Sequence, residues 1–221
     1  MKLTVIAATG GIGSAVLAQA LEAGHEVTAA VRDPAKVDAD VRVVAVDMGR
    51  PDPGALRSAV EGADAVLSGL GPRGQAEFGI VSRGTAALVE AVRAAGVRRV
   101  LAITGVGLST VATPIRPKPS RREPGAGAIM NLITLPLARR VLGGHMPDAA
   151  LAEQILADSG LDWTSVRVPY LLDKPLTGVY QVAYGVSLPR AFRLGRADAA
   201  HFMLRAIGDE RSFGRYVTVA Y

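Results

Sequence analysis

The chain has 221 residues, of which 49% are hydrophobic and 5% aromatic, and it contains no cysteine. A chain of this length can bury roughly 70% of the surface that it exposes when unfolded, which argues against a disordered protein and favours a single domain. The lack of cysteine excludes disulfides, thiolate metal sites and a cysteine nucleophile. We find no signal peptide and no membrane-spanning run, and therefore expect a cytoplasmic protein without a membrane partner.

The net charge of +5 comes from 25 Lys and Arg against 20 Asp and Glu. Residues 111–147 carry six basic residues and Glu123 as the only acid, whereas the rest of the chain has 19 of each sign. The six basic residues are Arg116, Lys118, Arg121, Arg122, Arg139 and Arg140. The excess charge thus belongs to one stretch, and because its basic run at 114–122 has no aromatic residue, we expect no nucleic-acid partner.

Short β-branched runs alternate with Ala- and Leu-rich helical stretches over the first hundred residues. This alternation is typical of βαβ units and of a parallel sheet. The predicted strands are residues 3–7, 26–31, 41–46, 63–67 and 98–103, and the predicted helices are residues 12–23, 54–61 and 78–95. We therefore predict an α/β fold with a Rossmann-type, doubly wound parallel sheet and helices on both faces.

The second half of the chain is less regular. A Pro-rich basic run at 114–124 cannot be helical inside and predicts a loop. Beyond it we expect helices at 128–142, 148–159 and 197–207, strands at 163–168 and 215–219, and an extended segment at 178–186. Asp148 is the expected N-cap of its own helix. We divide the single domain into a cofactor half, residues 1–110, and a substrate-side half, residues 111–221.

A glycine turn joins the first predicted strand to the first predicted helix, with the sequence Thr9-Gly10-Gly11-Ile12-Gly13. Gly10 lets the backbone approach a pyrophosphate, and Gly13 lets the helix pack close to the strand. The start of the helix offers unpaired N–H groups to phosphates. The strand, turn and helix context favours a dinucleotide site over a turn with incidental glycines.

Arg32 follows the second predicted strand, where an acid would hold the ribose 2′-hydroxyl of NAD and an arginine would hold the 2′-phosphate of NADP. Because a guanidinium forms paired hydrogen bonds with phosphate, we expect NADP(H) to be preferred over NAD(H), with Lys36 as a second contact. The alternatives are that Asp33 takes the role of the acid, or that Arg32 and Asp33 are a solvated pair that caps the turn before Pro34.

Several motifs together resemble those of the atypical short-chain dehydrogenases/reductases, and most closely the NAD(P)H-binding group of NmrA-like and biliverdin reductase B-like (flavin reductase) proteins. They are the glycine turn and residues 31–34, 46–47, 66–71, 152–164, 166–169 and 196–200. The resemblance implies that the pyrophosphate is bound by Ala8, Thr9, Gly10, Gly11, Ile12 and Gly13, and the 2′-phosphate by Arg32. It further implies that Asp47 and Met48 border the adenine, and that Ser68, Gly69, Leu70 and Gly71 line the ribose side. Thr104 would lie next to the nicotinamide.

The sequence departs from this family in two places. The turn begins with Ala7 where glycine is common, and we expect a negative φ there, which alanine allows. Ordinary short-chain dehydrogenases use a Tyr-x-x-x-Lys pair on the helix after strand five, but residues 148–159 contain neither. Tyr170 and Lys174 have the right spacing but follow the sixth strand, where we expect a loop, so we interpret this match as accidental.

The reaction inferred from these features is a hydride transfer whose chemistry belongs to the nicotinamide. A flavin or quinone delocalises the charge that it gains, so it needs a dedicated proton donor less than a ketone does. We therefore expect an NADPH-dependent oxidoreductase that reduces a flavin, a quinone or a similar conjugated acceptor, with no metal. The alternatives are an NmrA-like NADP(H) sensor without turnover and an epimerase or isomerase.

Three residues are candidate catalytic proton donors: Thr104, Tyr170 and His145. Each has a simpler interpretation, since Thr104 can orient the nicotinamide or its ribose, Tyr170 can form a pocket wall, and His145 can be a loop surface residue. The expected partner is a small-molecule acceptor, which the basic stretch would steer if it is anionic, unless that stretch is only a solvated loop. We expect a monomer or a small homo-oligomer.

Overall fold

The central sheet places its strands so that their carboxyl ends meet along one edge. The structure, a computed structural model, describes residues 1–221 apart from the side chain of Leu142. The strand order is β3 (Arg42–Ala45), β2 (Glu26–Val31), β1 (Lys2–Ile6), β4 (Ala65–Ser68), β5 (Arg99–Gly105), β6 (Asp162–Val168), β10 (Arg215–Ala220) and β8 (Gln181–Tyr184). All neighbours are parallel except β10 and β8. The order reverses between β1 and β4, and sheets of this kind bind ligands outside that point.

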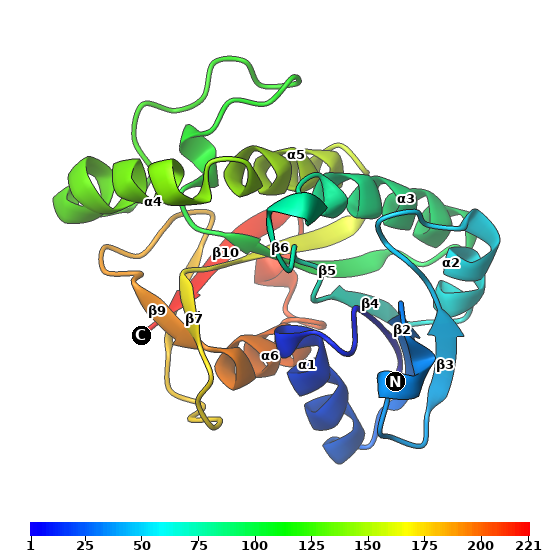
Figure 1. Cartoon of the computed structure of the whole chain (residues 1–221). Coiled ribbons are helices and arrows are strands. Elements are labelled where there is room, and N and C mark those ends of the chain that lie inside the picture. Colours follow the sequence, from blue (N-terminus) through cyan, green and yellow to red (C-terminus); the bar gives the residue numbers. More distant parts are fainter.

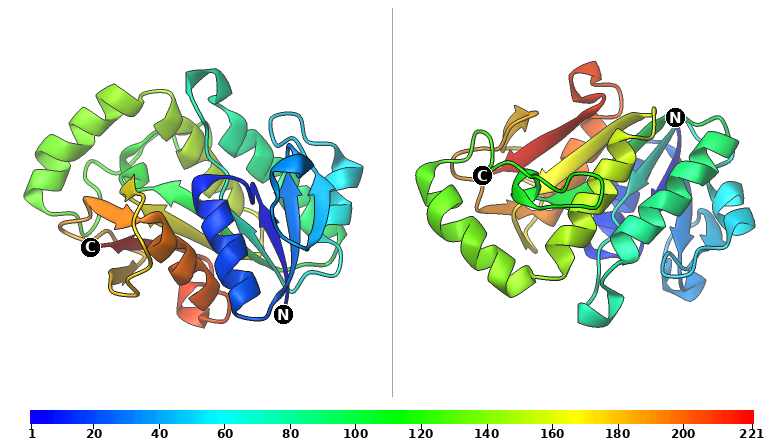
Figure 2. Two further views of the ribbon diagram at one scale, coloured as in Figure 1. Left: turned by 60° about the horizontal axis from the view of Figure 1, so that its bottom comes forward. Right: turned by 90° about the horizontal axis from the view of Figure 1, so that it is seen from above.

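Helices cover both faces of this sheet (Figure 1, and from two further sides in Figure 2). They are α1 (Gly11–Glu22), α2 (Pro53–Val60), α3 (Ile80–Ala94), α4 (Leu135–Leu142), α5 (His145–Ala157) and α6 (Arg196–Arg205). α1 and α6 pack together on one face, and α3 packs between α2 and α5 on the other. The predicted Rossmann-type α/β fold is therefore confirmed. None of the helices in the described chain is long and apolar enough to cross a membrane.

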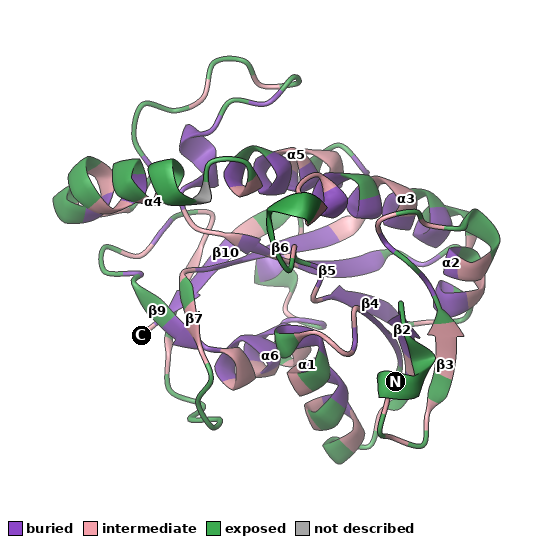
Figure 3. Ribbon diagram, viewed as in Figure 1, coloured by how far each residue is buried: buried purple, intermediate pink, exposed green. Residues whose placement is uncertain are grey.

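The central strands are buried on both sides because helices cover both faces (Figure 3). Every residue of β4 is buried, and β1 is buried from Leu3 onward. Their sequences are accordingly almost continuous apolar runs, as expected of strands inside a parallel sheet. Two apolar cores result, one between the sheet and the α1–α6 layer and one beneath α2, α3 and α5.

Ala7 adopts a left-handed backbone with a φ of 58°, so the negative φ expected from the sequence is wrong. Its carbonyl accepts the N–H of Gly10 at 2.8 Å, and a Cβ added to Gly13 would lie 2.1 Å from the same oxygen. The chain turns so tightly between β1 and α1 that this carbonyl lies against the first turn of the helix. The alanine side chain makes that conformation unfavourable by about 1–2 kcal/mol.

Asp148 does not cap its own helix, because α5 begins three residues earlier, at His145. Its buried carboxylate instead accepts the backbone N–H groups of Gly79, Val81 and Ser82, at 3.0, 3.1 and 2.9 Å. These donors lie at the start of α3, so one helix supplies the cap of another. The correction has a clear cause, since the sequence shows that an aspartate can cap but not which helix end lies beside it.

Two further differences lie in the second half. The helix expected at 128–142 contains a π-helical turn, Met130–Thr134, before α4. Pro136 follows directly, and a proline cannot donate to the preceding helical turn, which favours such an irregularity. Tyr170 lies in a short strand, β7 (Tyr170–Leu172), which pairs in parallel with β9 (Arg193–Gly195), and not in the expected loop.

We predict that Ala7→Gly raises the free energy of unfolding by about 0.5–1 kcal/mol, because glycine removes the left-handed strain at some cost in unfolded-state entropy. Urea unfolding would measure the change. The matched control is Ala86→Gly, in the middle of α3, where glycine should lower stability by about 1 kcal/mol. A loss of stability in Ala7→Gly would contradict the assigned backbone conformation.

Candidate functional site

A cavity of about 1120 Å³ opens along the carboxyl ends of β1, β2, β4, β5 and β6. This volume exceeds the roughly 300–1,000 Å³ of a typical small-molecule pocket, so the cavity has room for a large ligand or for two. One end is polar and lies beside the glycine turn and β2. The other end is apolar and is walled by α4, α5, β7 and the two residues that precede β9, Ala191 and Phe192. The apolar wall includes Leu108, Met130, Leu135, Met146, Leu171 and Phe192.

The polar end fits a pyrophosphate. Among the described residues no side chain caps the start of α1, so its first N–H groups are free to bind a ligand. The turn also has no room for side chains, since a Cβ added to Gly69 would lie 2.8 Å from the nitrogen of Gly13. Arg196, the first residue of α6, crosses the turn, and a Cβ added to Gly11 would meet its Nε at 2.7 Å. Free amides and a guanidinium therefore converge where an anion is expected.

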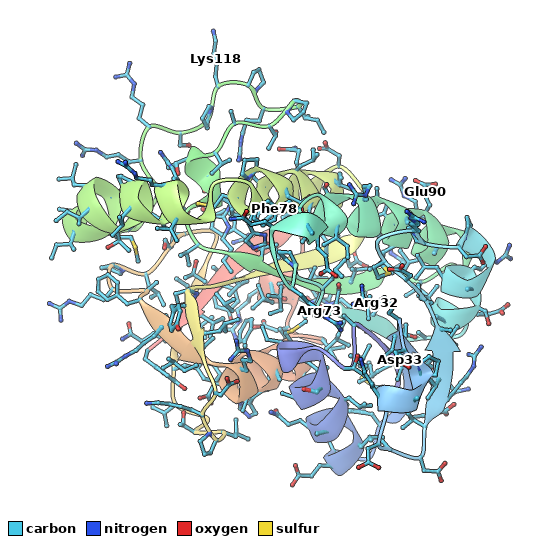
Figure 4. The ribbon with its side chains drawn as sticks, viewed as in Figure 1. Arg32, Asp33, Arg73, Phe78, Glu90 and Lys118 are labelled. Carbon is cyan, nitrogen blue, oxygen red and sulfur yellow. The ribbon has the colours of Figure 1, made fainter. Side chains whose placement is uncertain are left out.

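Arg32 lies at the same end of the cavity but is already paired with an acid (Figure 4). Its Nη1 is 3.0 Å from Oε1 of Glu77, and Glu77 also accepts the backbone N–H of Arg73 at 2.8 Å. These two hydrogen bonds hold the pKa of the Glu77 carboxyl below its usual value. A phosphate that binds Arg32 must therefore compete with Glu77.

The alternative in which Arg32 and Asp33 cap the turn before Pro34 holds for Asp33 alone, which caps the short helical turn Pro34–Lys36. Its carboxylate accepts the N–H of Ala35 at 3.3 Å and lies 3.4 Å from Nζ of Lys36. Lys36 and Arg32 both line the cavity, whereas Asp33 does not. The cation expected to read a 2′-phosphate is thus oriented toward the cavity, and the acid that would read a ribose hydroxyl is turned to its own local helix.

Most of the residues implied as cofactor contacts lie on the cavity wall. These are Thr9, Gly10, Gly11, Ile12, Arg32, Asp47, Met48, Gly69, Leu70, Gly71 and Thr104. The other three, Ala8, Gly13 and Ser68, do not line the cavity and support its wall from below. Sequence reasoning missed Arg73 and Arg196 as lining residues. Arg196 lies far from the glycine turn in the sequence, and only the packing of α6 beside α1 brings the two together.

Thr104 presents its hydroxyl oxygen to the cavity as an acceptor. Its Oγ1 lies 2.6 Å from Oγ of Ser165, and Ser165 lies 2.6 Å from Oε2 of Glu153. The Glu153 carboxylate can only accept, so the single proton of Ser165 points to it and the proton of Thr104 points to Ser165. The free lone pairs of Thr104 are left for a ligand, which favours an orienting role over proton donation.

Behind Thr104 lies a fully buried arginine. Arg167 forms ion pairs with Glu153 and, from Nη1 at 2.6 Å, with Oε1 of Glu123, while its guanidinium carbon is 3.5 Å from the centre of the Tyr216 ring. Glu123 also accepts from the hydroxyl of Ser109 at 3.0 Å. The one acid of the basic stretch is thus buried and ties the loop at 114–124 to β6.

The basic stretch does not take the place expected beside the substrate mouth. None of its six basic side chains lines the cavity, and Lys118, at the tip of the loop, points away from it (Figure 4). The part of residues 111–147 that walls the cavity is instead the apolar segment around α4. Steering of an anionic acceptor by basic side chains at the mouth therefore has no support from the described residues.

His145 and Tyr170 both line the apolar end. Burial lowers the pKa of the His145 imidazole, and the Asp148 carboxylate only partly opposes that shift, so the ring is neutral at neutral pH. It stacks on Phe78 with ring centres 6.5 Å apart. Tyr170 is 75% exposed at the rim, and Lys174 does not line the cavity, so the Tyr-x-x-x-Lys spacing forms no catalytic pair there.

The sheet order, the glycine turn and the cavity across it define a Rossmann-type dinucleotide-binding domain. The chain belongs to the NAD(P)H-binding family, whose model matches residues 7–210. The resemblance to the atypical short-chain dehydrogenases/reductases is confirmed at the level of family and fold.

Solved structures share this fold over the whole chain. A short-chain dehydrogenase/reductase from Veillonella parvula, in complex with NADP, is 19% identical, with a TM-score of 0.75 over 100% of this chain and 94% of the other. Two more carry provisional descriptions. One is an NADH-flavin reductase from Streptococcus pneumoniae, 22% identical, with a TM-score of 0.72 over 100% and 99% of the two chains. The other is an exported protein from Burkholderia pseudomallei, 29% identical, with a TM-score of 0.71 over all of both chains.

We predict that Glu123→Gln lowers the free energy of unfolding by about 3 kcal/mol, because it removes one partner of a buried ion pair. It should also speed trypsin cleavage at Arg121 and Arg122, since the loop loses its anchor. Denaturant unfolding and timed proteolysis measure the two effects. The exposed Glu61→Gln is the control, with a change within about 0.5 kcal/mol. Unchanged proteolysis of Glu123→Gln would contradict the anchoring role.

Proposed function

We propose that the protein is an NAD(P)H-dependent reductase of a flat, conjugated acceptor such as a flavin or a quinone, and that it prefers NADPH. One observation carries the proposal: a single cavity joins the phosphate-binding turn to an apolar chamber, with Thr104 between them. A dinucleotide with its phosphates at the turn would extend toward the chamber, where a second molecule has room.

The protein's own groups bind and orient. The start of α1 and Arg196 would hold the pyrophosphate, and Arg32 would hold a 2′-phosphate in exchange for Glu77. A bound nicotinamide would supply the hydride. Thr104 would accept a hydrogen bond from the carboxamide or a ribose hydroxyl and so help to orient the ring. The apolar walls exclude water from the reacting atoms.

The chamber suits an acceptor that delocalises charge. Its wall is apolar, and the only histidine in it, His145, is neutral at neutral pH. The absence of a Tyr–Lys pair among the described lining residues disfavours a ketone, which needs a proton as hydride arrives. The flavin-reductase description of the Streptococcus protein supports this choice of acceptor, although that description names NADH as the cofactor. The NADP complex of the Veillonella protein bears on the cofactor and supports the use of NADP(H).

The direct test is to mix purified protein with NADPH and a panel of flavins, quinones and dyes, and to follow the loss of absorbance of the reduced cofactor. We expect turnover with at least one conjugated acceptor. Thr104→Ser should keep the activity, and Thr104→Val should reduce kcat/KM about 10- to 100-fold by removing the acceptor oxygen. Tight NADPH binding without turnover above the uncatalysed rate would instead indicate a sensor.

Cofactor choice is tested with Arg32 and Glu77. Arg32→Ala should weaken NADPH binding about 10- to 100-fold and NADH binding hardly at all, because only NADPH carries the 2′-phosphate. Glu77→Gln should tighten NADPH about 2- to 5-fold by releasing Arg32. Calorimetric titration measures both, and Arg57→Ala, exposed and outside the cavity, is the control. Equal losses for both cofactors in Arg32→Ala would overturn the preference.

A further inference from the structure

The segment around α4 exposes far more apolar surface than the rest of the molecule. Five side chains between residues 129 and 141 are 60–72% exposed, although all are large and aliphatic. They are Ile129, Leu132, Ile133, Leu137 and Val141. Single exposed aliphatic residues are common, but a contiguous group marks a surface that another body covers. We call these five side chains the α4 apolar face; α4 lies at one end of the molecule (Figure 3).

Residues 111–147, which carry this face, hold six basic residues and no exposed acid. All six basic residues of 111–147 lie on α4 or on the neighbouring loop, and none forms an ion pair with any other described residue. The only acid of the stretch, Glu123, is buried against Arg167. The +5 excess of the whole chain is therefore concentrated around one apolar face.

Hydrogen bonds hold the loop and the helix together. Nη2 of Arg139, on α4, donates to the carbonyl of Thr110 at 3.1 Å. The N–H of Glu123 donates to Oδ1 of Asn131 at 2.8 Å, and Nδ2 of Asn131 donates to the carbonyl of Ala126 at 2.9 Å. Nη2 of Arg116 likewise donates to the carbonyl of Leu108 at 2.9 Å, so both arginines have neutral carbonyls as partners and keep their positive charge. Apolar face and cations thus belong to one connected surface.

We infer that this surface binds the anionic surface of a lipid bilayer. A helix that presents aliphatic side chains beside arginines and lysines lies in the plane of the interface, with its apolar face among the acyl chains and its cations on the headgroups. Arg139 and Arg140, next to Leu137 and Val141, are long enough to reach the headgroups while these side chains insert. The expectation of no membrane partner rests on the lack of an apolar run long enough to span a bilayer, a criterion that does not test for a helix lying on the surface.

The composition of this surface argues against two other partners, a second copy of the chain and a nucleic acid. In a symmetric contact with a second copy the face would meet itself, and six cations would approach six more with no exposed acid from the same stretch to pair with them. A nucleic acid would satisfy the cations but would leave the aliphatic side chains without a partner, since the surface offers no aromatic ring for base stacking. An anionic bilayer satisfies both halves of the surface.

The same surface adjoins the apolar end of the cavity. Val141 belongs to the α4 apolar face and also lines the cavity, together with the exposed Tyr170 and the partly exposed Phe192. If the protein reduces a conjugated acceptor, a consequence that rests on the proposed function, an acceptor dissolved in the bilayer could enter without crossing water. Binding to the bilayer itself requires neither cofactor nor turnover.

The test is flotation of the full chain, without cofactor, with phosphatidylcholine vesicles that contain or lack phosphatidylglycerol. We expect binding to the anionic vesicles to be at least about tenfold tighter and to fall as salt is added. The double variant Ile133→Ser, Leu137→Ser should weaken it about tenfold or more, and its control is Leu176→Ser, Val179→Ser, which removes exposed aliphatic residues elsewhere. A triple variant of the loop, Lys118→Gln, Arg121→Gln, Arg122→Gln, should weaken binding to the anionic vesicles. Its control, Arg50→Gln, Arg57→Gln, Arg83→Gln, has the same net charge but keeps the loop cations, and should weaken that binding less.

Circular dichroism and cofactor titration show whether each variant is folded, since none of the altered α4 or loop residues lines the cavity. Failure to float with anionic vesicles overturns the inference, as does equal binding to neutral ones. The inference is also overturned if light scattering shows a wild-type dimer that the double variant Ile133→Ser, Leu137→Ser makes monomeric. Selective binding of nucleic acid would overturn it as well. Vesicle binding without NADPH oxidation would support the surface and refute the reductase, so the two proposals fail separately.

Discussion

The contact between the Ala7 carbonyl and the first turn of α1 is the constraint on which the site depends. It leaves no space for a Cβ at residue 13 and forces a left-handed backbone at residue 7. In return, the helix starts close enough to β1 for its free N–H groups to face the cavity. Gly69, just after β4, packs against the same turn. The ends of β1 and β4 therefore meet at the polar end of the cavity with backbone alone between them.

A second constraint organises the part of the cavity wall around Thr104. Arg167 lies in β6, and its ion pairs reach α5 through Glu153 and the basic loop through Glu123. Through Ser165 the same Glu153 sets the direction of the Thr104 hydroxyl. One buried guanidinium therefore connects the surface loop at 114–124 with the direction of the Thr104 hydroxyl proton beside the cavity. The first constraint thus places backbone amides at the polar end of the cavity, and the second orders the side chains behind Thr104, between the two ends.

Local features were predictable from the sequence, and contacts between distant segments were not. The strands of the first half and the Thr9–Gly13 turn follow from hydrophobic period and glycine spacing, and both lie where they were expected. The pairing of Arg32 with Glu77, the crossing of Arg196 over Gly11 and the capping of α3 by Asp148 each join segments separated by at least 45 residues. Ala7 is an instructive exception, because its turn is local but its left-handed backbone opposes the preference of alanine and accompanies the close contact of its carbonyl with Gly10 and Gly13.

The burial of Arg167 has a consequence for the history of the chain. Because Glu123 comes from the basic loop, a descendant that lost the loop would keep an arginine inside the protein with one of its two carboxylates gone, at a cost comparable to a large part of a domain's stability. Loss of the loop and replacement of residue 167 by an apolar side chain should therefore occur together in evolution. The surface loop at 114–124 is therefore required for the stability of the interior, through the carboxylate of Glu123.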